Sequence, residues 1–163
     1  MNRAYRALLT LAVAAAWIGC GRTTTVTSPE GEEATVSESG GEVQITVQGE
    51  DGGTVKFAAN QAGVALPKDF PKDVPIYPEA TVIANAAGQK MRNVTLQSAD
   101  SAREVKAFYA ERLPQNGWEI ETSLDTAQGA MLTAKKQQQR LMAMISTRNT
   151  RTIVVLTVGE EGK

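Results

Sequence analysis

The sequence predicts an α+β fold: an antiparallel β-meander with one amphipathic helix packed on a face, preceded by a β-hairpin and a disordered tether. Two observations carry this prediction. Short runs of alternating apolar and polar residues recur between residues 42 and 158, and residues 102–113 show the three- and four-residue spacing of a helix. The connections between the runs are short, which favours antiparallel neighbours. At 163 residues, the chain is long enough for one domain with appendages.

The composition argues against several classes of site. The 17 basic and 18 acidic residues nearly cancel, so the chain lacks the strongly basic field that non-specific nucleic-acid binding needs. The lack of histidine removes the commonest general base and the commonest metal ligand. With a single cysteine, the chain can form neither an intramolecular disulfide nor a thiolate zinc site. We therefore expect no nucleic-acid partner, no metal, no cofactor and no enzymatic activity.

The first 20 residues have the composition of an export signal. Arg3 and Arg6 supply the positive charge, and residues 7–18 form a mostly apolar run. This run is too short to span a hydrocarbon core of about 30 Å, which takes roughly 20 helical residues. The segment is therefore predicted to direct export and not to span a membrane.

Cys20 ends this run and follows the small residue Gly19. The arrangement resembles the lipobox of bacterial lipoproteins, although Trp17 stands where that family usually has leucine. The resemblance implies that the Cys20 sulfur receives a diacylglycerol, that residues 1–19 are removed as a signal peptide, and that the protein is anchored by lipid to a membrane of the bacterial cell envelope, outside the cytoplasm. Two alternatives remain open. Cleavage after Ala16 would release a soluble secreted protein with a free thiol, and an uncleaved chain would bury Cys20 as a structural residue.

Residues 20–41 are rich in Thr, Ser, Glu and Gly and nearly free of apolar residues, which predicts a flexible acidic tether. About 20 such residues give an r.m.s. reach of roughly 25 Å. Residues 42–63 are predicted as a β-hairpin and linker, because residues 42–48 and 54–57 alternate on either side of a glycine-rich turn. Such a hairpin is marginal alone, so we expect it to dock on the main sheet or on a partner.

The α+β domain is predicted over residues 64–163. It begins with a strap, residues 66–80, in which four prolines forbid a helix. A strap that packs on its own domain is favoured over a polyproline ligand for an aromatic groove. The helix begins with a capping box of Ser101 and Glu104. The predicted strands cover residues 81–84, 91–97, 118–121, 130–135, 140–146 and 152–158.

Four residues form the candidate binding surface: Phe108, Trp118, Met142 and Met144. The two methionines make strand 140–146 apolar on both faces, as expected for a central strand covered by the helix on one side and by the hairpin on the other. A methionine-lined surface also suits an adaptable binding site. For Phe108, packing in the core is the simpler alternative.

A second resemblance rests on the run Asp73-Val-Pro-Ile-Tyr-Pro78 with Phe108-Tyr109, Leu113 and Gly117-Trp118. The pattern is similar to a small domain of uncharacterised bacterial envelope lipoproteins and would cover residues 66–158. It implies one folded unit and carries no activity or site residues.

Together, these features predict a membrane-anchored envelope lipoprotein that acts as a non-enzymatic binding or structural module for an envelope protein or a cell-wall partner. The alternative is a carrier or sensor that holds a small apolar ligand between helix and sheet. A cavity lined by Phe108, Met142 and Met144 would favour the carrier, whereas a closed core beneath Phe108 and Trp118 would argue against it.

Overall fold

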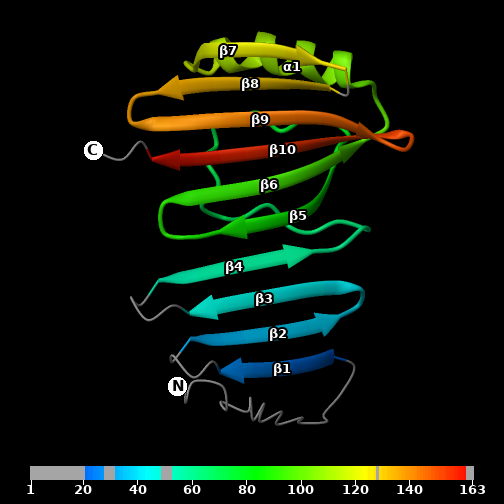
Figure 1. Ribbon diagram of the computed structural model, residues 1–163, viewed down its shortest axis with the longest axis vertical. Helices are drawn as coiled ribbons and strands as arrows, with labels where there is room; N and C mark the ends of the chain where they lie inside the picture. Colours follow the sequence, from blue (N-terminus) through cyan, green and yellow to red (C-terminus); the bar gives the residue numbers. More distant parts are fainter. Residues whose placement is uncertain (1–20, 28–31, 49–52, 128, 161–163) are drawn as a thin grey trace, which may run out of the picture.

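The computed structural model describes residues 21–27, 32–48, 53–127 and 129–160 (Figure 1). Within these residues the chain forms one antiparallel sheet of ten strands and a single helix. The elements are β1 (Gly21–Thr27), β2 (Glu33–Ser39), β3 (Glu42–Gln48), β4 (Thr54–Ala59), β5 (Thr81–Ala87), β6 (Met91–Ser98), α1 (Ala102–Gln115), β7 (Glu119–Thr126), β8 (Gly129–Lys136), β9 (Gln139–Arg148) and β10 (Arg151–Glu160).

The strand order is β1-β2-β3-β4-β5-β6-β10-β9-β8-β7. The first six strands pair in the order of the sequence. The chain then crosses through α1 to the far edge of the sheet, and β7 to β10 return until β10 pairs with β6 (Figure 1). The predicted antiparallel meander with one helix on a face is confirmed. The strands dominate more than predicted, so the fold is closer to all-β than to α+β.

The prediction of a disordered tether is wrong for the described residues between 21 and 41, because β1 and β2 lie there. β1 is rich in threonine, and β2 carries Thr35 and Val36; such β-branched side chains favour extended backbone. Gly40 and Gly41 have φ angles of 59° and 81° and join β2 to β3, as a two-residue hairpin turn requires. Cys20 lies outside the described residues and immediately precedes β1.

The predicted hairpin is confirmed as β3 and β4, and it docks on the main sheet through pairing of β4 with β5. It therefore extends the sheet in its own plane. The prediction that it covers the second face of strand 140–146 is wrong, because a strand that pairs at an edge cannot lie over a face.

The helix packs on one face of the sheet, which we call the inner face; the opposite face is the outer face. The predicted capping box forms: the Glu104 amide donates to Ser101 Oγ at 3.3 Å, and the Ser101 amide donates to Glu104 Oε2 at 3.0 Å. Val105, Tyr109 and Leu113 are fully buried against the sheet. Each such side chain contributes about 1.5–3 kcal/mol by burial, so this stripe holds the helix in place.

The strap packs on its own domain, as predicted. Phe70 and Val74 are buried in the same core as the helix. The Trp118 indole donates to the Asp73 carbonyl at 3.1 Å, and the Tyr77 hydroxyl donates to Asp100 at 2.8 Å. These contacts fasten the strap to the inner face beside α1.

The apolar side of the strands changes face along the sheet. In β6 and β8 to β10, the buried apolar residues, such as Leu96 and Ile145, point to the inner face. In β2 to β4 the register places Val36, Ile45 and Phe57 side by side on the outer face. The change follows a register shift in β5 between Val82 and Ala84. A bulge moves later side chains to the other face, so the two halves of the sheet have opposite apolar sides.

In the part of the chain that the structure describes, no helix has both the length and the apolar character needed to cross a membrane.

Candidate functional site

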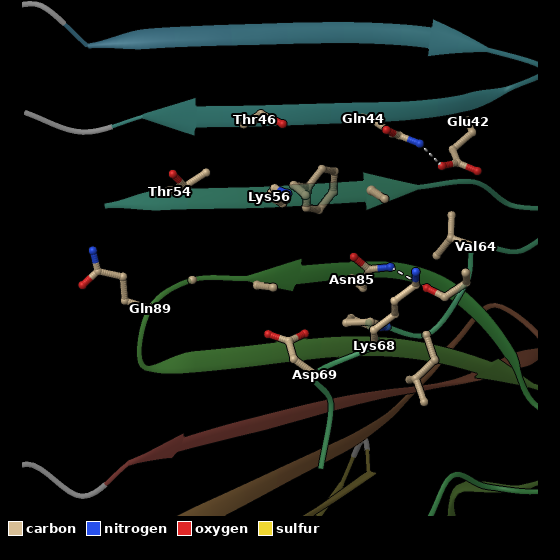
Figure 2. A pocket seen from close by; sticks show the side chains of 17 residues that line it. Glu42, Gln44, Thr46, Thr54, Lys56, Val64, Lys68, Asp69, Asn85 and Gln89 are labelled. Carbon is tan, nitrogen blue, oxygen red and sulfur yellow. Dashed lines mark hydrogen bonds between the residues drawn. The ribbon is translucent and has the colours of Figure 1, made fainter. Parts of the chain in front are cut away.

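The strap and strands β3 to β5 enclose an open groove of about 820 Å³ on the inner face, which we call the strap groove (Figure 2). One wall is formed by residues 64–69, and the floor is formed by inward-facing side chains of the three strands. Its lining combines apolar residues such as Val64 and Leu66 with polar side chains, which include Gln44, Thr46, Lys56, Lys68, Asn85 and Gln89.

Hydrogen bonds hold both sides of the strap groove. Asn85 Nδ2 on β5 donates to the carbonyl of Ala65 at 2.8 Å, which ties the strap to the floor. Gln44 Nε2 donates to Glu42 Oε1 at 2.6 Å along β3. The groove is therefore built on paired strands and a fastened strap, so its polar groups have defined positions.

Four charged residues line the strap groove: Glu42, Lys56, Lys68 and Asp69. Asp69 forms an ion pair with Arg92, and the Glu42 carboxylate accepts the hydrogen bond from Gln44. Within the described residues, neither Lys56 nor Lys68 forms an ion pair, and both side chains line the groove (Figure 2). Two ammonium groups without carboxylate partners can donate charge-assisted hydrogen bonds to an anionic group. The groove therefore suits a polar ligand that carries negative charge.

A second groove of about 630 Å³ lies between α1 and the β7–β8 connection. Its lining includes five alanines, together with Arg103, Lys106 and Asp125. The Lys106 ammonium contacts the Asp125 carboxylate at 2.7 Å, so the two charged groups satisfy each other. This groove offers fewer groups to a ligand than the strap groove does.

Two tyrosine hydroxyls near the helix have raised pKa values. The pKa of Tyr77 is raised to about 12, first by its hydrogen bond to Asp100 and then by burial. Burial raises the pKa of Tyr109 further. Both phenols stay protonated near neutral pH, whereas a general acid or base works best with a pKa near the working pH.

The carboxylates of β7 lie in an ion-pair cluster. Lys135 Nζ is 3.5 Å from Glu119 Oε2 and 3.7 Å from Glu121 Oε1, and Arg140 Nη2 is 3.5 Å from Glu121 Oε2. The cluster lies at the solvent-exposed surface of the sheet. Surface ion pairs contribute little, about 0–1 kcal/mol each.

The structure separates the four residues of the predicted binding surface. Phe108 stacks edge-on against Tyr77 with ring centroids 5.1 Å apart, and Trp118 is only 2% exposed beneath the strap. Met142 and Met144 lie on the outer face, 38% and 53% exposed. The sheet stands between the two pairs, because alternate residues of β9 point to opposite faces. They do not form one surface, and they do not line a common cavity.

The core between helix and sheet is closed. The side chains that meet there are buried from both sides: Val105, Tyr109, Leu113 and Trp118 against Leu132, Ala134, Leu141, Ala143 and Ile145. This is the arrangement that argues against a carrier with its ligand between helix and sheet.

Sequence reasoning missed the strap groove because its walls are far apart in the chain. Residues 64–69 and β3 meet only through the tertiary pairing of β4 with β5. The available signal was the polar side of the hairpin, where Gln44, Thr46 and Lys56 share one face. A polar face of this kind is usually solvated, so the pattern alone did not mark a site.

Comparison with known protein families gives a match over part of the chain. A family model described as START domain-like matches residues 78–157, which is just under half of the chain. The matched part runs from the end of the strap through most of β10 and includes α1. No curated protein and no solved structure matches the chain. Over its helix-bearing half the chain is therefore similar to the START domain-like family, and β1 to β4 lie outside that similarity.

Proposed function

We propose that this protein is a non-enzymatic binding module of the bacterial cell envelope, anchored by lipid on Cys20, whose strap groove binds a polar, negatively charged ligand. The observation that carries the proposal is the strap groove itself, about 820 Å³ in volume and lined by Lys56 and Lys68 without ion-pair partners among the described residues. Amide and hydroxyl groups from Gln44, Thr46 and Asn85 add donors and acceptors.

The anchor is supported by the sequence of the first 20 residues. The apolar run that ends at Gly19-Cys20 resembles a lipobox, and β1 begins at the next residue, Gly21. An acyl chain on Cys20 would therefore hold the edge of the sheet beside the membrane, with no tether between them. The strap groove would then face material close to the membrane surface.

The match to the START domain-like family favours a second candidate, a module that binds a small ligand. A carrier with an apolar ligand between helix and sheet would require the closed core around Tyr109 and Trp118 to open. The strap groove needs no such opening. We therefore place the ligand there and keep the apolar carrier as the alternative.

The groove is tested with isolated peptidoglycan sacculi, which present hydroxyl, amide and carboxylate groups together. The full-length protein in detergent is expected to co-sediment with sacculi, and the double variant Lys56→Gln, Lys68→Gln is expected to bind about tenfold more weakly or worse, because each charge-assisted hydrogen bond contributes about 1.5–3 kcal/mol.

The matched control is the double variant Lys72→Gln, Lys90→Gln, which removes the same charge from outside the strap groove. It is expected to bind as the unmodified protein does. Equal losses in both variants would show attraction by net charge alone, and absence of co-sedimentation would show that the wall polymer is not the ligand. Either result would overturn the groove assignment.

A further inference from the structure

We propose that the outer face of the sheet is the interface with a second copy of this chain, so that two sheets pack face to face as a β-sandwich. The first argument is that the apolar side chains of β2 to β4 lie on the outer face. In β2 to β4 the row Val36, Ile45 and Phe57 lies on the outer face, while their inner face carries Thr, Ser, Gln and Lys. Antiparallel strands that alternate in this way pack their apolar side and expose their polar side. In the described chain, α1 and the strap lie on the inner face, so nothing covers this apolar row.

The second argument is the distribution of exposed apolar side chains. Among the described residues, seven large apolar side chains are exposed, and all but Leu66 lie on the outer face. These six are Val55, Phe57, Met91, Leu124, Met142 and Met144. They lie on β4, β6, β7 and β9, so both halves of the sheet contribute exposed apolar side chains to this face, with the polar residues Asn93, Thr95 and Gln97 of β6 between them. Exposed apolar side chains that gather on one face mark interaction sites.

The third argument is size. A strand of seven residues is about 24 Å long, and ten strands about 4.8 Å apart make a sheet about 43 Å wide. The face therefore measures on the order of 1,000 Å², above the roughly 800 Å² per partner that a stable interface buries.

The fourth argument is the placement of charged and aromatic residues, and it favours a second copy over a membrane surface. The charged side chains of the outer face lie near strand ends: Glu38 is the register partner of Arg22, Lys135 and Arg140 lie 3.5–3.7 Å from Glu119 and Glu121, and Arg148 and Arg151 flank the β9–β10 turn. The centre of the face carries no charge, so a second copy can pack there without burying an unpaired charged group. Trp118, Tyr77 and Tyr109 all lie on the inner side, whereas membrane-facing surfaces are rich in such residues.

The test is the oligomeric state of the full chain carrying Cys20→Ala, which removes the lipid so that the result does not depend on the anchor. Sedimentation velocity across the micromolar range is expected to show a dimer. Val36→Lys would bury an unpaired charge, so it is expected to weaken the dimer about a hundredfold or more. Ser37→Lys, on the inner face of the same strand and outside the strap groove, is the matched control and is expected to leave the dimer intact.

Met144→Lys, on β9, repeats the test from the other half of the sheet if Val36→Lys impairs folding, which circular dichroism reports. A monomer throughout the concentration range would overturn the proposal, and so would equal weakening by Val36→Lys and Ser37→Lys. Vesicles of phosphatidylglycerol are tested in parallel. A monomer that binds these vesicles, and loses binding with Val36→Lys, would identify a membrane as the occupant of the face and would also overturn the proposal.

Discussion

Cys20 is the residue whose chemistry would decide where this protein resides. Replacing it by alanine removes the only thiol and so the attachment point of the proposed diacylglycerol. We expect Cys20→Ala to move the protein from the membrane fraction to the soluble fraction and to change its migration in gel electrophoresis. Multiple acyl chains anchor stably, at about 0.8 kcal/mol per buried methylene, so the shift should be nearly complete.

The control is Trp17→Leu, which places the residue that bacterial lipoproteins usually have at this position and should leave the protein in the membrane fraction. If Cys20→Ala stayed membrane-bound with unchanged migration, the anchor would be disproved while the strap groove and the dimer would still stand.

Tyr77 offers a second test at the scale of single residues. Its pKa is raised from 10.0 to about 12, because its hydroxyl donates to Asp100 and is partly buried. A phenol with a folded-state pKa above its unfolded value stabilises the fold fully below pH 10, and this contribution is lost as the pH rises toward 12. We expect Asp100→Asn to lower the pKa of Tyr77 toward 10, measured by phenolate absorbance against a Tyr77→Phe reference.

Glu79→Gln serves as the comparison, since Glu79 contributes least among the groups that raise the pKa of Tyr77. A shift as large as that of Asp100→Asn would show that overall charge, and not the hydrogen bond, holds the proton.

At the scale of elements, the close approach of β8 to β9 depends on Gly129. A Cβ placed on this residue would lie 1.9 Å from the carbonyl oxygen of Ile145, a backbone atom that cannot move without breaking the strand pair. We expect Gly129→Ala to lower the free energy of unfolding by at least about 2 kcal/mol, because overpacking forces the backbone to shift. Urea unfolding measures this as a lower midpoint with an unchanged slope.

Gly159→Ala is the matched control, since a Cβ there would first meet the Lys90 carbonyl oxygen at 3.5 Å, an ordinary contact. If both variants had the same midpoint, the tight approach of β8 and β9 at Gly129 would be wrong.

The strands also show which elements can be predicted from local sequence patterns. The helix, its capping box and the strands from β3 onward follow from periodicity and turn residues, and the structure confirms them. β1 and β2 were missed because their sequences are mostly polar and bury few apolar groups. Hydrogen bonds to neighbouring strands of the sheet make these segments strands. The amino-acid composition of a segment does not show which other segment it will pair with.

At the scale of the whole molecule, the pairing of β6 with β10 joins two meanders with opposite apolar sides. One half is covered by α1 and the strap, whereas the other half has its apolar row on the outer face. This division explains why the predicted binding surface did not form: Phe108 belongs to the covered side and Met144 to the uncovered side. It also gives the molecule two separate candidate sites, the strap groove and the outer face.

The sequence by itself determined the elements that depend on near neighbours: the helix with its capping box, the strap and the β3–β4 hairpin. Only the tertiary structure decided which face each strand presents and what lies over it. The register shift between Val82 and Ala84 turns the apolar side from one face to the other, and the pairing of β4 with β5 brings Lys56 and Lys68 to one groove. Both depend on contacts between distant segments, so the periodicity of any one segment cannot specify them.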